Sequence, residues 1–168
     1  GYYNQEGIIV GSDFERFTGK LNLSNQATDF LKIGMNNTLG YTVQNTPPGA
    51  LGAANPGLFA NIIPGTNPIY QVDENGDPIL VGGQKVFDYS NPVQLDFNPV
   101  GLAERDIYET KTGRVLSNVY AELTLLKDIT FNSILSVDYI VLNDQLYYNP
   151  DHGNGATVGG RSQVMNHD

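Results

Sequence analysis

The sequence has no cysteine, little basic charge and no long apolar run. The absence of cysteine from all 168 residues excludes a disulfide scaffold, a thiolate metal site and a cysteine nucleophile. Nine Lys and Arg stand against 18 Asp and Glu, and the net charge of −9 excludes a nucleic-acid or anionic membrane-surface partner. No run approaches the roughly 18 apolar residues that a membrane-spanning helix needs. The sequence therefore predicts no transmembrane helix.

Catalytic motifs are missing as well. The sequence has no G-x-S-x-G elbow, no H-E-x-x-H pair and no phosphate-binding P-loop. The two histidines, His152 and His167, stand apart in polar segments, which favours surface histidines over metal ligands. Glu122 and Asp138 could form a carboxylate pair, but charges that pair with basic residues are the favoured interpretation. We therefore expect no enzyme, no catalytic residue, no cofactor and no metal ion.

The residues that are present indicate a β protein. The mean hydropathy is −0.26 although only 16% of residues are charged, because 18 Asn, 19 Gly and 10 Tyr supply the polarity. This composition suits an extracellular or outer-membrane β protein. Residues 1–10 suggest a strand end that runs into Ile8-Ile9-Val10, and no helix is predicted, since 25–29 and 101–106 are too short. Four longer runs alternate with the period of a strand, at 14–23, 31–43, 114–126 and 130–141.

The two sides of these four runs differ in charge. From Phe17 onward, one side carries no charged residue, and its only polar members are Asn37, Ser117 and Ser133. The other side mixes Thr, Asn, Ser and Gly with charges that include Arg16, Lys20, Lys32, Glu122 and Asp138. A soluble sandwich alternates in the same way, because one face of each sheet is core and the other is wet. Alternation alone therefore leaves two architectures open.

The connections favour a barrel. Short turns at 25–29 and 127–129 join the runs in pairs, whereas the region 45–110 is long, acidic and rich in Asn-Pro turns, and the segment from Asn143 onward is polar. Alternating short and long connections are typical of outer-membrane barrels, and strands of about 10–13 residues can cross a bilayer. We therefore predict an all-β fold, an antiparallel up-and-down transmembrane β-barrel segment of about four to five strands.

The barrel interpretation assigns the aromatic residues to two levels. Phe17, Tyr41 and Tyr139 would lie on the lipid side toward the outer end, and Phe131 toward the inner end, as in aromatic girdles. The smallest such barrels have about eight strands, so we expect these 168 residues to be part of a larger unit. A start at Gly1 without a signal peptide is expected of a processed or internal segment.

The region 45–110 carries two features that could bind a ligand. Aromatic residues stand there among Asn and Asp, at Tyr70, Phe87, Tyr89 and Phe97. Such a mixture suits a sugar- or peptide-binding surface, but packing of the loop on itself is the favoured explanation. The segment 73–78, DENGDP, opens like a calcium loop, but Pro78 stands where glycine is needed, which favours an Asn-Gly turn. The sequence therefore assigns no ligand-binding residue.

Four segments together resemble a known family. The stretch YNQEGIIVGSDFERFTGKLNLSNQATDFLKIGM, at 3–35, resembles the barrel of SusC/RagA-type TonB-dependent outer-membrane transporters. The stretch NVYAELTLLKDITFNSILSVDY, at 118–139, resembles it as well. Two shorter segments support the match, IYQVDENGDPI at 69–79 and YYNPDHGNG at 147–155, and the four segments follow one another in an order that fits the family. The resemblance covers well over half of the chain and is a pattern of strands and turns rather than a catalytic motif.

The resemblance implies a barrel of about 22 strands with an N-terminal plug. Its partners would be a SusD-like surface lipoprotein, TonB acting through the plug, outer-membrane lipid, and an oligosaccharide or peptide substrate. The chain has no plug, TonB box or signal sequence, so we expect 1–168 to be an internal part of the barrel domain, with 45–110 as a long extracellular loop region. A soluble extracellular β-sandwich that binds glycans is the alternative, and a secreted carbohydrate-active enzyme is a third class.

Overall fold

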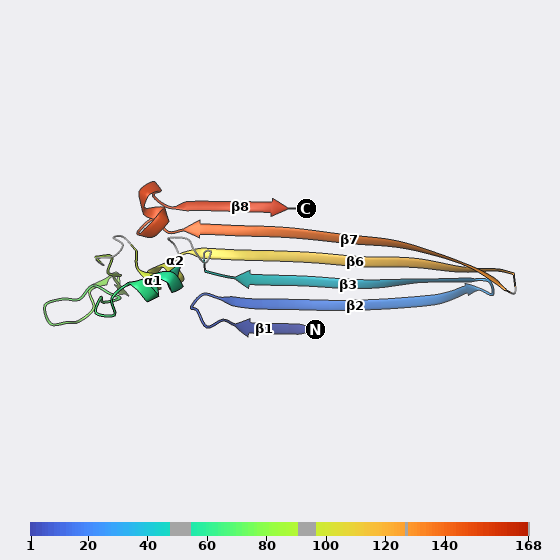
Figure 1. Ribbon diagram of the computed structural model, residues 1–168, viewed down its shortest axis with the longest axis horizontal. Coiled ribbons are helices and arrows are strands. Elements are labelled where there is room, and N and C mark those ends of the chain that lie inside the picture. Colours follow the sequence, from blue (N-terminus) through green and yellow to red (C-terminus); the bar gives the residue numbers. More distant parts are fainter. Residues whose placement is uncertain (48–54, 91–96, 127, 168) are drawn as a thin grey trace.

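The computed structural model describes residues 1–47, 55–90, 97–126 and 128–167, and its fold is all-β and antiparallel. Six strands form one sheet in the order β1-β2-β3-β6-β7-β8. They are β1 (Tyr2–Glu6), β2 (Asp13–Thr28), β3 (Leu31–Asn45), β6 (Ile107–Leu126), β7 (Ile129–Tyr148) and β8 (Arg161–His167). Figure 1 shows the long connections at one end of the sheet, which we call the loop end; the opposite end is the turn end.

The four long strands follow from the four alternating runs. β2 and β3 pair in continuous register from the Asp13–Asn45 pair to the Thr28–Leu31 pair, with one irregularity near Thr28. β6 and β7 pair in the same way along 20 residues each. The predicted runs are therefore confirmed as strands, and each of them extends further toward the loop end than the alternation indicated, since polar residues there still complete the backbone ladder.

Short elements gather at the loop end. They are the helices α1 (Pro56–Ile62) and α2 (Pro99–Arg105), the hairpin of β4 (Leu80–Val81) and β5 (Gln84–Lys85), and the 3-10 helix η1 (Gly153–Val158). We call the described residues of 55–106 and 149–158, which include α1, α2 and η1, the cap. The expectation of no helix was wrong. α1 and α2 are short, but each starts at an Asn whose side chain accepts backbone N–H groups, followed by proline at the first helical position.

Two other expectations need correction at the sheet edges. β1 ends at Glu6, and Ile8-Ile9-Val10 lie in a turn, because the Gly7 amide donates to Ser12 O and the Ser12 amide donates to Ile9 O. The polar segment from Asn143 onward is partly strand, since β7 continues to Tyr148 and β8 pairs with it. The described sheet thus has six strands rather than four to five, with β1 and β8 at its edges.

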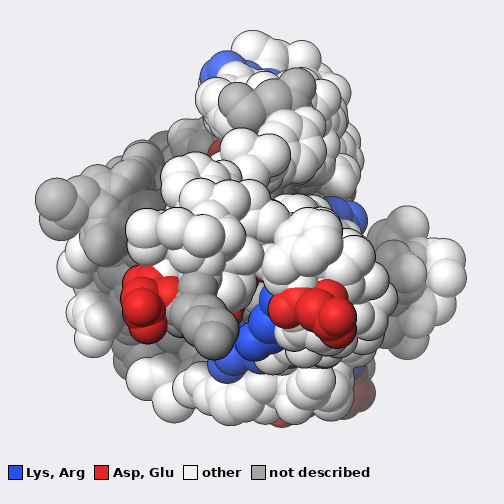
Figure 2. Space-filling model, turned by 90° about the vertical axis from the view of Figure 1, so that its right-hand side faces the viewer, with Lys and Arg blue, Asp and Glu red and all other residues white. Residues whose placement is uncertain are grey.

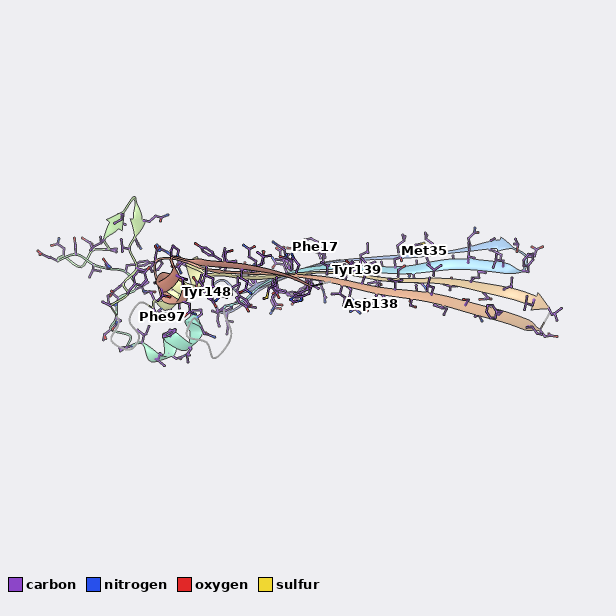
Figure 3. All side chains as sticks on the ribbon, turned by 90° about the horizontal axis from the view of Figure 1, so that it is seen from above. Phe17, Met35, Phe97, Asp138, Tyr139 and Tyr148 are labelled. Carbon is purple, nitrogen blue, oxygen red and sulfur yellow. The ribbon has the colours of Figure 1, made fainter. Side chains whose placement is uncertain are left out.

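The buried core lies outside the sheet. The fully buried apolar side chains of the described residues are those of Phe59, Phe87, Phe97 and Leu102, all at the loop end. Seen edge-on, the sheet is a single layer with side chains projecting from both sides (Figure 3). No second sheet packs on either face within the described residues.

No helix in the described part of the chain is long and apolar enough to cross a membrane.

Candidate functional site

One face of the sheet is apolar and uncovered. The register places the apolar side of every predicted run on this face, with Leu23 opposite Met35, Met35 opposite Val119, and Val119 opposite Leu135. We call this surface the apolar face. Many of its large side chains are between 39% and 69% exposed, and others such as Met35 and Leu123 are half-buried, although most apolar side chains in a folded domain are buried. The exposed ones include Phe17, Leu21, Leu23, Ile33, Leu39, Tyr41, Val115, Val119, Phe131, Leu135, Val137 and Tyr139. A surface of this size needs a covering medium or partner.

The apolar face ends along polar rows near the loop end. Directly paired residues on six strands form one row, with Val43 as its apolar member: Asn4, Glu15, Val43, Lys111, Asn143 and Asn166. The next row outward contains Asp13, Asn45, Glu109 and Gln145, and Lys111 forms an ion pair with Glu109 at 2.5 Å. Charge therefore returns to this face at the same level on neighbouring strands.

Aromatic side chains lie just inside that boundary. Tyr2, Phe17 and Tyr41 are direct neighbours on three strands, and the Tyr2 and Phe17 ring centroids are 4.9 Å apart. Tyr139 lies opposite Val115, in the next row of this face toward the turn end. Phe131 lies close to the turn end, opposite Leu123. The structure thus gives the predicted relative positions of the four aromatic residues, and it adds Tyr2.

Two polar residues interrupt the apolar face and satisfy each other. Asn37 and Ser117 are directly opposite on β3 and β6, and the Ser117 hydroxyl donates to Asn37 Oδ1 at 2.6 Å. A polar group with a hydrogen-bond partner costs far less to remove from water than an unpaired one. Ser133, the third predicted polar member, lies opposite Ala121.

The other face, which we call the polar face, carries paired charges and amides. Arg114 donates two hydrogen bonds to Asp138, from Nε to Oδ1 at 2.8 Å and from Nη2 to Oδ2 at 2.5 Å. The Ser136 hydroxyl donates to Asn118 Oδ1 at 2.6 Å. Viewed from the turn end, the surface is mostly uncharged with a few acidic and basic groups (Figure 2). The favoured interpretation of Asp138 as a partner of a basic residue is confirmed.

The geometry does not bring Glu122 and Asp138 together. Glu122 pairs with Asn132 on β7, and Asp138 lies six residue steps further along that strand. Six strand residues span about 20 Å, at roughly 3.3 Å each. Carboxylates that cleave glycosidic bonds lie only about 5–9.5 Å apart. These two side chains therefore cannot act as one such pair.

The cap has its own small core. The rings of Phe59 on α1 and Phe97 stack with centroids 5.0 Å apart, and Leu102 on α2 packs against both and is only 1% exposed. Asn98 holds three segments together beside this core. Its Oδ1 accepts from the Val100 and Gly101 amides, and its Nδ2 donates to Ile69 O at 2.9 Å and Asp88 O at 2.8 Å. The base of the 69–88 segment is thereby fixed to α2.

A buried histidine joins the last loop to the cap. His152 is fully buried, so its expected surface position was wrong. Its ring stacks on Tyr89 at 4.7 Å, and its amide donates to Asn149 Oδ1 at 3.2 Å. The Asn149 amide donates to Asp106 Oδ1 at 2.9 Å. Within the described residues His152 Nδ1 and Asp106 Oδ2 have no hydrogen-bond partner. His167, in contrast, is exposed on β8.

Burial shifts the pKa values of His152 and Asp106 in the directions that favour their neutral forms. Burial lowers the pKa of His152 below its ordinary value of 6.5, and the nearby Arg105 lowers it further, against the attraction of Asp106 and Asp151. Burial also raises the pKa of Asp106 above 3.8, against the hydrogen bonds that Asn149 donates to it. The cap is therefore built around a neutral histidine.

Acid should loosen the last loop. The folded state binds a proton at His152 less readily than the unfolded chain does. The stability that neutral His152 contributes to the fold is therefore complete above about pH 6.5 and is lost as the pH falls below that value. Amide exchange at Asp151 and His152, whose N–H groups both bind Asn149 Oδ1, would report this. The raised pKa of Asp106 acts with the opposite sign, so the variant His152→Gln provides the control. Equal acid sensitivity in both proteins would contradict the assignment to His152.

The four aromatic residues predicted to bind sugar or peptide mostly pack within the loop end. Phe87 and Phe97 are 4% and 8% exposed, so neither ring can stack on a ligand. The ring centroids of Tyr70 and Phe87 are 5.1 Å apart. The Lys85 Nζ lies 4.9 Å from the centroid of the Tyr70 ring. Packing of the loop on itself, the favoured explanation, therefore accounts for them.

The acidic segment 73–78 forms a turn. Asp73 Oδ1 accepts from the amides of Asn75 at 2.8 Å and Asp77 at 2.9 Å, and Gly76 has a φ of 89°. The backbone hydrogen bonds lower the pKa of Asp73. The favoured Asn-Gly turn is confirmed. Among the described residues no group of three His, Asp or Glu side chains gathers as a metal site would require.

Comparison with known proteins adds no name to these features. Neither the protein-family models nor the curated proteins compared with the chain give a match.

Proposed function

We propose that this chain forms part of the wall of an outer-membrane TonB-dependent transporter of the SusC/RagA type. The complete transporter would import oligosaccharides or peptides together with a SusD-like lipoprotein. The observation that carries the proposal is the uncovered apolar face, which ends at polar rows on neighbouring strands. In this arrangement the apolar face contacts lipid, the polar face lines the lumen and the loop end is extracellular.

The height of the apolar face supports a bilayer as the covering medium. On β7 the stretch from Phe131 to Val141 spans ten residue steps, with Ile129 beyond Phe131 at the turn. At roughly 3.3 Å a step this is about 33 Å, and a strand tilted by about 40° would cover about 25 Å along the membrane normal. The apolar band of outer-membrane barrels is about 25 Å tall.

The turn-end limit of the band shifts from strand to strand, as tilt requires. On β2 the last apolar residue of this face is Leu23. On β7 the apolar residues of this face continue to Phe131, which pairs through Leu123 and Leu31 with Thr28 of β2, and end at Ile129 beside the turn. The limit therefore moves several residues toward the turn end between β2 and β7. A horizontal membrane surface crosses tilted strands at such a progressive offset.

A glycan-binding sandwich, the alternative, would have to cover the same face with a second sheet about 10 Å away. The described residues supply none. The aromatic residues just inside the polar rows also suit a membrane interface, where ring edges meet headgroups. Both points favour the barrel wall over the sandwich.

Fractionation of cells that make the whole protein tests the proposal. We expect the polypeptide in the outer membrane, resistant to alkaline washing and released only by detergent, because lipid contact holds the apolar face. A protein recovered in the aqueous fraction as a folded monomer would contradict the barrel wall and support the sandwich.

The arm at 69–88 should contribute to partner binding. Its tip exposes Leu80 and Val81 at 60% and 68%, while the Gln71 amide donates to Val86 O at 2.9 Å near its base. Replacing residues 72–85 by an Asp-Gly turn keeps that base and the buried Phe87. We expect co-purification with the SusD-like lipoprotein to fall while membrane insertion is unchanged. Undiminished co-purification would show that the arm plays no part in docking.

A further inference from the structure

We propose that Asn75 is a site of spontaneous deamidation and isoaspartate formation, and that the fold protects the other Asn-Gly pair of the chain. The two pairs are Asn75-Gly76, at the acidic turn, and Asn154-Gly155, in η1. Asn-Gly is the pair in which a side-chain amide is attacked most easily, because glycine has no Cβ to obstruct the approach. The proposal does not depend on the transport function.

The reaction needs only water. The backbone nitrogen of Gly76 attacks Cγ of Asn75, so that an N–C bond forms while the Cγ–Nδ2 bond breaks. The Gly76 amide proton leaves with Nδ2 as ammonia, and the product is a five-membered succinimide. Water then opens either carbonyl, which gives aspartate or an isoaspartate whose main chain runs through Cβ and Cγ.

The turn at Asn75 is held by few contacts. Every residue from 71 to 80 is exposed, and no atom lies within 4 Å of the position that a Cβ on Gly76 would occupy. The Gly76 amide donates to Asp73 O at 3.1 Å, and the Asn75 side-chain amide reaches Asp73 Oδ2 only at 3.5 Å. Moving the Gly76 nitrogen toward Cγ of Asn75 therefore requires a local opening of one exposed turn, which costs little free energy.

In the second pair Asn154 is exposed, but the glycines on both sides of it are embedded in the cap. Gly155 is buried, and a Cβ there would lie 2.0 Å from Asn149 O. The Gly160 amide donates to Gly155 O at 2.9 Å. The preceding Gly153 lies against the core, since a Cβ on it would come 3.0 Å from Leu102 Cδ2. Bringing the Gly155 nitrogen to Cγ of Asn154 thus requires η1 to leave the cap core.

Conversion of Asn75 would change the arm in charge and in length. The product adds a carboxylate beside Asp73, Glu74 and Asp77. The isoaspartate form adds a main-chain carbon between Asp73 and Asp77, whose backbone hydrogen bond is 2.9 Å long. The turn could then no longer hold both this bond and the Val72–Pro78 pairing.

Peptide mapping of the purified protein tests the proposal. The protein is incubated in a mildly alkaline buffer made with heavy-isotope oxygen water, and mass spectrometry measures isotope incorporation at residues 75 and 154. Because η1 must first leave the cap core, we expect Asn75 to react at least about tenfold faster than Asn154. Fragmentation that cleaves beside Cβ should identify isoaspartate at residue 75.

A denatured sample separates the fold from the neighbouring residues. In denaturant the two rates should approach each other, because both pairs are then unhindered. Asn75→Gln should abolish the signal at 75, since glutamine must close a larger ring, and Asn154→Gln is the matched control that leaves it unchanged. Equal rates in the folded protein, no reaction at Asn75, or a rate difference that persists in denaturant would overturn the proposal.

Discussion

Replacing Leu135 with arginine is expected to destabilise the membrane-inserted protein by about 2–4 kcal/mol, the cost measured for arginine on the lipid face near the bilayer midplane. Leu135 lies midway along the apolar stretch of β7 and is 69% exposed, so no packed neighbour has to move to admit a longer side chain. The loss therefore measures the surroundings of the face rather than a steric clash. Urea titration in lipid vesicles would give the difference in unfolding free energy.

Ser136→Arg is the matched control. Ser136 is the next residue on β7 but lies on the polar face, where it binds Asn118. There an arginine would meet water in the lumen, so we expect a change of no more than about 1 kcal/mol, the loss of one exposed hydrogen bond. If both variants were equally stable, lipid would not cover the apolar face and the barrel wall would be rejected.

Replacing Leu102 with alanine is expected to cost the cap about 2–5 kcal/mol, the range for removing a buried leucine side chain. Leu102 is 1% exposed and packs on Phe59 and Phe97. The core of the cap consists of few side chains, so neighbouring residues have little capacity to fill the cavity. Amide exchange should increase in α1, α2 and η1, while the paired strands near the turn end keep their protection.

Leu58→Ala supplies the comparison. Leu58 lies on α1 but is 38% exposed, so its loss should change the cap by only a few tenths of a kcal/mol. Increased exchange along the whole of β6 and β7 in Leu102→Ala would contradict the expectation that the strands near the turn end keep their protection. That result would mean that the cap core also stabilises the strands far from the loop end.

The sheet could be predicted from the sequence because its signal is local and repeated. Alternation with period 2 assigns each residue to a face, and a slip by one residue would invert every assignment. Once Leu23 and Met35 were assigned to one side, the positions of Val119 and Leu135 followed from the same rule. β8 was missed because most of its residues are polar, and β1 was placed too long because Ile8-Ile9-Val10 are apolar but lie in a turn.

The cap could not be predicted because distant residues hold it together. His152 reads as a surface histidine until Tyr89 and Asn149 are placed beside it. One signal was present in the sequence but was interpreted as turns only. Asn55-Pro56 and Asn98-Pro99 begin helices, with the Asn side chain as N-cap, and Asn149 Oδ1 accepts amides in the same way ahead of η1.

The alternating sequence of the two hairpins, β2 with β3 and β6 with β7, also affects which pairing register can be assembled. Each joins long strands by a short turn, so its contacts are close in sequence and can form early. If the β6–β7 hairpin closed one residue out of register, one strand would be inverted relative to the other, so Arg114 and Asp138 would lie on opposite faces and Leu135 would no longer share a face with Val119. Such a hairpin could not enter a bilayer, so misregistered chains would be left at the water interface and excluded from the finished sheet. In a barrel wall, the alternation that defines the two faces would therefore also exclude misregistered hairpins during insertion.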